Sequence, residues 1–165
     1  MREAVRVPFF TEEFTADPLS RSVIQKDGRP AKDFVTILVL HYLQKKLEGL
    51  APLTGVWISF KELESGEQYY PAFRKRSIDL ILKKYSSDPS PLEGAAGRLP
   101  GGRKGGQGDY SVIADSFPGV PIQVVLWKGD DEFAAEANIL FDSSIGAIFC
   151  TEDVAVLAGF TAKYF

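Results

Sequence analysis

Apolar positions along the chain alternate between strand-like and helix-like spacing. The longest apolar run, Val120 to Trp127, contains a single polar side chain, Gln123. A run of this length that is rich in β-branched residues predicts a strand covered on both faces. An acidic turn follows, and Asn138 to Phe141 predicts a second short strand. The two strands predict a hairpin with a long connection, which we place at the centre of a sheet.

Further strands are predicted before this hairpin. Tyr110 to Phe117 precedes it directly, and the dipeptide Pro118-Gly119 provides the turn between them. The first thirty residues contain three prolines, which keep strands short or confine them to a sheet edge. Short strands are predicted there at Val5–Val7, Phe9–Phe10 and Ser22–Gln25.

Helical spacing is clearest from Asp33 to Glu48. At about 100° per residue its apolar side chains form one broad arc, and cations near its C-terminal end suit the helix dipole. A second helix is predicted over Ile78–Tyr85. A third is predicted over residues 152–162, with Thr151 as its N-cap and two acidic residues in its first turn.

The segment between the first two helices gives mixed signals. Ser59-x-x-Glu62 matches a capping box, and Gly66 is placed to end a short helix there. Gln68 to Arg76 then brings three aromatic residues next to three cations. We interpret this stretch as a half-buried edge segment whose tyrosine hydroxyls reach the rim.

The most glycine-rich part of the chain is Gly94 to Gly108, with seven glycines. Its GGRKGG sequence superficially resembles a phosphate-binding loop, but it lacks the GxxxxGK[ST] order. We therefore predict a flexible surface loop.

These elements predict an α+β fold: a mixed, mostly antiparallel sheet with about three helices packed on it, in a single domain of residues 1–165. The one cysteine excludes an internal disulfide and fits a reducing, cytoplasmic location. We expect no signal peptide and no membrane span, because no stretch approaches about 18 uninterrupted apolar residues.

Charge is distributed unevenly along the chain, although the net charge is only −3. Residues 71–108 carry 8 basic and 3 acidic side chains (net +5), whereas residues 109–165 carry 2 and 9 (net −7). Such runs usually form solvated surface, and the alternative is a basic face for an anionic partner. Nucleic acid is not expected as a partner, because the chain is acidic overall and shows no recognised binding motif.

Catalytic signals are weak. The single histidine, His41, lies toward the polar side of its predicted helix, and any catalytic or metal partners would have to come from other elements. Cys150 precedes a predicted helix N-terminus, where a thiolate would be stabilised, but its apolar neighbours indicate a buried structural residue. We assign no catalytic residues.

Two candidate sites follow from the residue types. The first is an aromatic and cationic surface that would bind a planar or anionic ligand or a protein partner. It comprises Trp57, Tyr69, Tyr70, Arg74, Arg76 and Trp127. The alternative is a metal site, in a metal-dependent enzyme or a metal-binding protein, because carboxylate oxygens suit hard cations. Its candidate ligands are Asp130, Asp131, Glu132, Asp142 and Asp153.

Six segments, taken in order, resemble those of a known family. They are ILVLHYL (Ile37–Leu43), GVWISFKEL (Gly55–Leu63), YYPAFRKR (Tyr69–Arg76), VVLWKGDDEF (Val124–Phe133), ANILFDSS (Ala137–Ser144) and TEDVAVL (Thr151–Leu157). Together they cover most of the chain and resemble the bacterial and archaeal domain of unknown function family 3786.

The resemblance implies a setting rather than a reaction. Members are associated with anaerobes, and some are fused to iron–sulfur domains like those of corrinoid proteins. The implied setting is redox or corrinoid one-carbon metabolism, with a redox or corrinoid protein as a possible partner. The resemblance supplies no catalytic residues and names no cofactor. We therefore expect a non-enzymatic ligand- or protein-binding accessory module.

Overall fold

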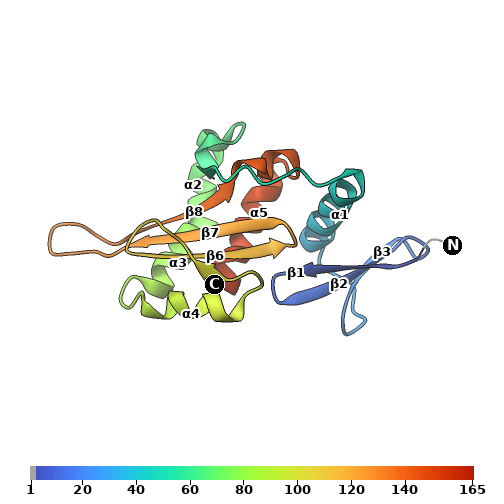
Figure 1. The fold of residues 1–165 in the computed structure, drawn as a ribbon, viewed down its shortest axis with the longest axis horizontal. Coiled ribbons are helices and arrows are strands. Elements are labelled where there is room, and N and C mark those ends of the chain that lie inside the picture. Colours follow the sequence, from blue (N-terminus) through green and yellow to red (C-terminus); the bar gives the residue numbers. More distant parts are fainter. Residues whose placement is uncertain (1–2) are drawn as a thin grey trace.

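The computed structural model describes residues 3–165, which form two antiparallel sheets and five α-helices (Figure 1). The strands are β1 (Val5–Phe9), β2 (Glu12–Asp17), β3 (Ser22–Gln25), β4 (Trp57–Ser59), β5 (Arg103–Lys104), β6 (Tyr110–Phe117), β7 (Val120–Trp127) and β8 (Glu136–Asp142). The helices are α1 (Asp33–Glu48), α2 (Gly66–Arg76), α3 (Ile78–Tyr85), α4 (Ser90–Arg98) and α5 (Thr151–Tyr164). The α+β prediction is confirmed.

The larger sheet has the order β4-β8-β7-β6-β5, and every neighbouring pair in it is antiparallel. The hairpin predicted at the centre is β7 and β8, in register from Ile122 opposite Phe141 to Trp127 opposite Glu136. β7 is buried along its length except at Trp127, which explains why its sequence shows no polar alternation.

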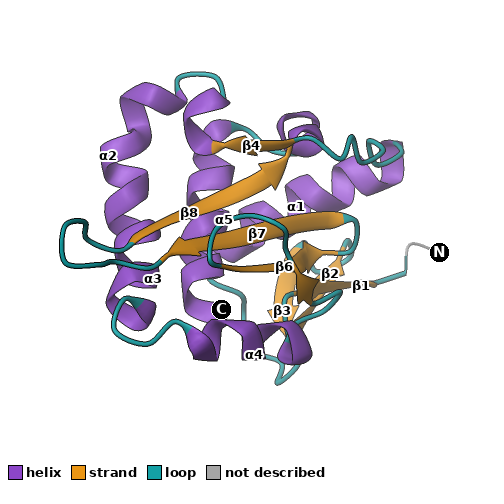
Figure 2. Cartoon of the chain, turned by 60° about the vertical axis from the view of Figure 1, so that its left-hand side comes forward, coloured by secondary structure: helices purple, strands orange, loops and turns teal. Residues whose placement is uncertain are grey.

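The two faces of this sheet are covered differently (Figure 2). Val124 belongs to the main hydrophobic core on the helical side, together with residues of α3, α4 and α5. Its neighbour Val125 points to the other face, where the chain segment of residues 99–109 passes close to its side chain. The helices therefore cover only one face of the larger sheet.

The smaller sheet, β1-β2-β3, joins the larger one through an aromatic cluster. The backbone N–H of Phe10 donates to the carbonyl of Ser116 (2.7 Å), and the Phe9 and Phe117 rings lie 4.7 Å apart. Tyr42 of α1 stacks on Phe117 at 4.5 Å, and its hydroxyl donates to the carbonyl of Pro118. One continuous core results.

Helix α2 departs most from its predicted structure. Residues 68–76, predicted as an edge segment, lie within this helix even though it contains Pro71. Gly66 begins the helix instead of ending the previous one: a Cβ there would lie 2.0 Å from the carbonyl oxygen of Phe60. The buried ring of Phe73 stacks on Phe60 at 4.0 Å, so tertiary packing overrides the local preference.

The predicted Gly94–Gly108 loop is only partly a loop. Its first residues complete α4, and Arg103–Lys104 pair with β6 as an edge strand. Farther along, the glycines allow close contact with the sheet: a Cβ at Gly105 would lie 2.0 Å from Ser111 Oγ. The flexibility predicted for this segment stays a prediction.

None of the helices in residues 3–165 has the length and apolar character that a transmembrane span requires.

Candidate functional site

The candidate site is a groove of about 660 Å³ between α2 and α5. The two helices run in the same direction. At their N-terminal ends, Thr151 Oγ1 donates to the carbonyl of Glu64 (2.7 Å). At the other end, Gly159 lies opposite the carbonyl of Arg76, close enough that an added Cβ would be 3.6 Å away. The two helices therefore lie side by side, and the groove follows the seam between them.

Small residues on both helices form the hollow. α2 contributes Ala72, and α5 contributes Ala155 and Gly159. On a helix, residues three or four positions apart share a face, so Ala155 and Gly159 lie in one row. Larger side chains complete the groove: Phe34, Phe60, Tyr69, Phe73, Val156 and Phe160. The result is a mostly apolar, aromatic concavity within the size range of small-molecule sites.

Charged residues lie at the two ends of the groove. Arg76 and Lys163 belong to the last turns of α2 and α5, and Glu152 belongs to the first turn of α5. Because the helices are parallel, both cations lie at one end and the carboxylate lies at the other.

α1 supplies the remaining wall. His41 Nδ1 lies 2.6 Å from Asp153 Oδ2, which ties the middle of α1 to the first turn of α5. Phe34 is two turns earlier in α1, and its side chain reaches the groove while staying 64% exposed. Phe34 therefore extends the apolar lining of the groove, and contiguous exposed apolar surface is typical of a binding site.

Two of the predicted ligand-binding residues, Tyr69 and Arg76, line this groove. Tyr70 does not: its ring packs on Phe73, with the Lys61 ammonium 4.4 Å from the ring centroid. Arg74 is engaged elsewhere, because its Nε donates to Asp79 Oδ1 at 3.1 Å.

Neither tryptophan lines the groove, and the two are far from each other. Trp57 pairs with Asp142 at one end of β8, and Trp127 pairs with Glu136 at the other. Six strand residues at about 3.3 Å each separate these positions by roughly 20 Å. The predicted six-residue surface is therefore not a single site.

The five carboxylates of the metal hypothesis are likewise not brought together. Asp130, Asp131 and Glu132 lie in the connection before β8, and Asp142 is the last residue of that strand. The length of β8 alone therefore separates Asp142 from the other three by about 20 Å. Asp153 is engaged with His41. Within residues 3–165, no three His, Cys, Asp or Glu side chains are grouped closely enough to hold a metal ion.

Asp142 has a structural role instead. Its carboxylate accepts hydrogen bonds from the backbone N–H groups of Thr54, Gly55 and Ser144. Burial favours the neutral form, but these hydrogen bonds outweigh it and lower the pKa of Asp142 to about 2. The residue fastens the segment before β4 to the edge of the larger sheet.

Cys150 and His41 both lie next to Asp153, at the N-terminus of α5. The predicted burial of Cys150 is wrong: its neighbours Ile148 and Phe149 are buried in the core, but Cys150 itself is exposed. Desolvation of the thiol, with the Asp153 carboxylate adding to it, raises the pKa of Cys150. A raised pKa opposes formation of the thiolate that a nucleophile needs. His41 interacts with the carboxylate, so the arrangement stabilises the contact between α1 and α5.

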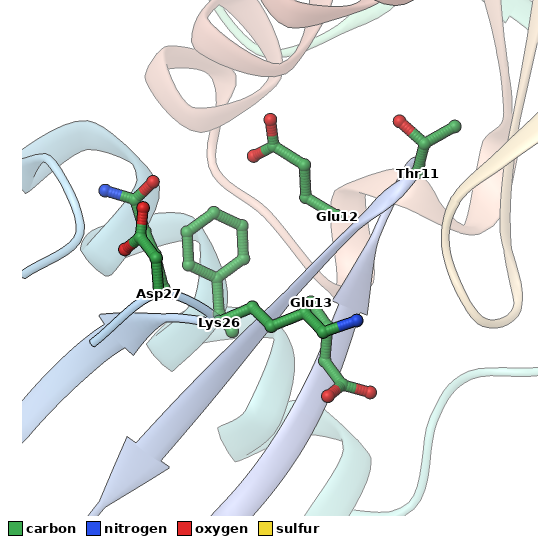
Figure 3. Close-up of a pocket in the computed structure, with 7 residues that line it drawn as sticks. Thr11, Glu12, Glu13, Lys26 and Asp27 are labelled. Carbon is green, nitrogen blue, oxygen red and sulfur yellow. The ribbon is translucent and has the colours of Figure 1, made fainter. Parts of the chain in front are cut away.

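A second hollow, of about 570 Å³, lies on the small sheet (Figure 3). Glu12 and Glu13 point to opposite sides of β2 there, as neighbouring strand residues do. Burial, and then the nearby Glu12 side chain, raise the pKa of Tyr164. Thr11, Lys26 and Asp27 complete a rim of exposed turn residues. This hollow lacks the apolar wall of the groove.

Several groove residues were missed by the sequence analysis: Phe34, Glu152, Ala155, Gly159 and Lys163. The row of small residues at positions 155 and 159 was the available signal. Its meaning depends on α2 lying beside α5, which the sequence does not reveal.

Comparison with curated proteins and with solved structures finds no match to either. A family model does match, over residues 1–164. The match agrees with the resemblance of the six ordered segments. The chain belongs to the family described as Domain of unknown function (DUF3786).

Proposed function

We propose that this chain is a non-enzymatic binding module that holds a ligand, or a segment of a partner, in the α2–α5 groove. The observation that carries the proposal is the groove itself, a ligand-sized hollow with aromatic walls and cations at one end. Phe34 and Tyr69, 64% and 50% exposed, border it and would become buried when it is occupied.

The chemistry of the surrounding groups favours binding over covalent catalysis. The hydroxyl of Thr151 donates a hydrogen bond to the carbonyl of Glu64, so it stabilises the contact between the N-terminal ends of α2 and α5. The thiol of Cys150 has a raised pKa, and His41 interacts with Asp153. Neither arrangement pairs a nucleophile with a general base.

The biological setting of the proposal rests on the family resemblance alone. In this setting, the chain is an accessory module of anaerobic redox or corrinoid metabolism, and its partner is a redox or corrinoid protein. In this proposal the groove is the surface through which the module holds its ligand or partner.

Filling the groove tests the proposal. Ala72 is exposed on α2 and lines the groove, so Ala72→Trp places an indole over it without disturbing the core. The probe is 8-anilinonaphthalene-1-sulfonate, which is apolar and anionic, and binding is measured by isothermal titration calorimetry. We expect the substitution to weaken binding about tenfold or more, which corresponds to at least about 1.4 kcal/mol.

The matched control is Lys75→Trp, an exposed position on the same helix that does not line the groove. It should bind the probe as the unmodified chain does. Equal binding by the Ala72→Trp variant would place the probe elsewhere and contradict the proposal.

A further inference from the structure

We infer that the groove takes a linear apolar ligand with a single anionic head, of which a medium-chain carboxylate is the simplest form. The head lies between Arg76 and Lys163, and the apolar chain runs toward Tyr69. This inference rests on the proposed function and specifies the ligand class of the same site.

The shape of the groove favours a linear ligand. Its lining on α5 extends from Thr151 to Lys163, and twelve residues at about 1.5 Å each span roughly 18 Å. The hollow follows the seam between two parallel helices and is open along one side. A volume of about 660 Å³ spread over that length is a narrow channel rather than a round pocket.

The charges favour an anionic head at one end. Arg76 and Lys163 together contribute two full positive charges where α2 and α5 terminate. The C-terminal ends of the two helices contribute about half a negative charge each, so the cations outweigh them. The guanidinium of Arg76 also presents a planar set of donors that matches a carboxylate.

The other end of the groove disfavours a second negative charge. Glu152 lines the groove one helical turn before Ala155, beside Thr151 and near Tyr69. A ligand with a carboxylate at each end would bring one of them next to Glu152, and like charges repel. The charge pattern therefore sets both the class of the ligand and its direction.

Three ligands of equal chain length test the inference by isothermal titration calorimetry: dodecanoate, dodecanol and dodecanedioate. Each exposed ion pair contributes little, so dodecanoate should bind roughly fivefold to tenfold more tightly than dodecanol. Dodecanedioate should bind more weakly than dodecanoate. Glu152→Lys should reverse the order of the two acids.

Substitution of the two cations locates the head. Arg76→Gln and Lys163→Gln should each weaken dodecanoate binding roughly threefold and leave dodecanol unchanged. Arg74→Gln is the matched control, because Arg74 lies on the same helix but bonds to Asp79. It should change neither affinity.

The outcomes separate the two proposals. If dodecanol and dodecanoate bind equally and both displace 8-anilinonaphthalene-1-sulfonate, the anionic head is wrong and the groove is still a binding site. If Arg74→Gln weakens dodecanoate binding as much as Arg76→Gln, the position of the head is wrong. If the groove binds none of the three twelve-carbon ligands and does not bind 8-anilinonaphthalene-1-sulfonate, both proposals are wrong.

Discussion

Small residues produce opposite results in two regions of this molecule. On the outer face of the larger sheet, Gly105 and Gly108 bring the chain of residues 99–109 into direct contact with β6 and β7. Between α2 and α5, Ala72, Ala155 and Gly159 leave an open groove. The sheet face is closed because the backbone of residues 99–109 packs directly against it. The groove between α2 and α5 is open because no large side chain fills the space beside these small residues.

Composition alone therefore does not show whether small residues close or open a surface. Gly105 has neighbours inside van der Waals contact, so any side chain there meets Ser111 and Gln123. Gly159 has a single neighbour at 3.6 Å, which is an ordinary contact distance. The same substitution is therefore expected to have opposite signs in the two regions.

The largest effect is expected for Gly105→Ala in the closed region. The new Cβ would lie 2.0 Å from Ser111 Oγ, so the covering segment would have to move away from the sheet. We expect a loss of about 3 kcal/mol in the free energy of unfolding, measured by urea denaturation. The control is Gly106→Ala, where nothing lies within 4 Å. A comparable loss in both variants would show that the contact with Ser111 is not the cause.

A smaller loss in the free energy of unfolding is expected when the Asp142 carboxylate is protonated or replaced. This residue fastens the edge of the same sheet. Its folded-state pKa of about 2 lies below the ordinary 3.8, so its stabilising effect is complete above about pH 4. It is lost as the pH falls from about 4 to 2. The difference in pKa corresponds to roughly 2 kcal/mol.

The Asp142→Asn variant tests this expectation. It should unfold at a lower urea concentration at pH 7, and its stability should fall less steeply between pH 4 and pH 2. If both chains lose stability equally in that interval, the acid sensitivity comes from other carboxylates.

The smallest effect is expected in the open region, and it is a gain. Gly159 lies inside α5, where glycine costs about 0.5–1 kcal/mol relative to alanine, and the added methyl group has room. Gly159→Ala should therefore raise the free energy of unfolding by about that amount, measured by the same denaturation. A loss of stability would mean that α2 and α5 approach more closely than a methyl group permits.

Sequence patterns located most elements of the fold, but they were less informative about the site. β6, β7, α1 and α3 have the predicted bounds because their apolar spacing is regular. β2 was missed, and α2 was misassigned because its tyrosines favour strands and Pro71 disfavours helix interiors. Of the six predicted surface residues, only Tyr69 and Arg76 line the groove.

Local spacing of apolar residues encodes which face each element buries, so the α+β class, the central hairpin and helices α1 and α5 could be predicted from the sequence. Which surfaces meet depends on the packing of the elements. The groove requires Arg76 and Lys163, 87 positions apart, to lie at the same end of two parallel helices. The closed sheet face requires Gly105 to lie against Ser111. Both depend on how the elements pack, and no local pattern carries that information.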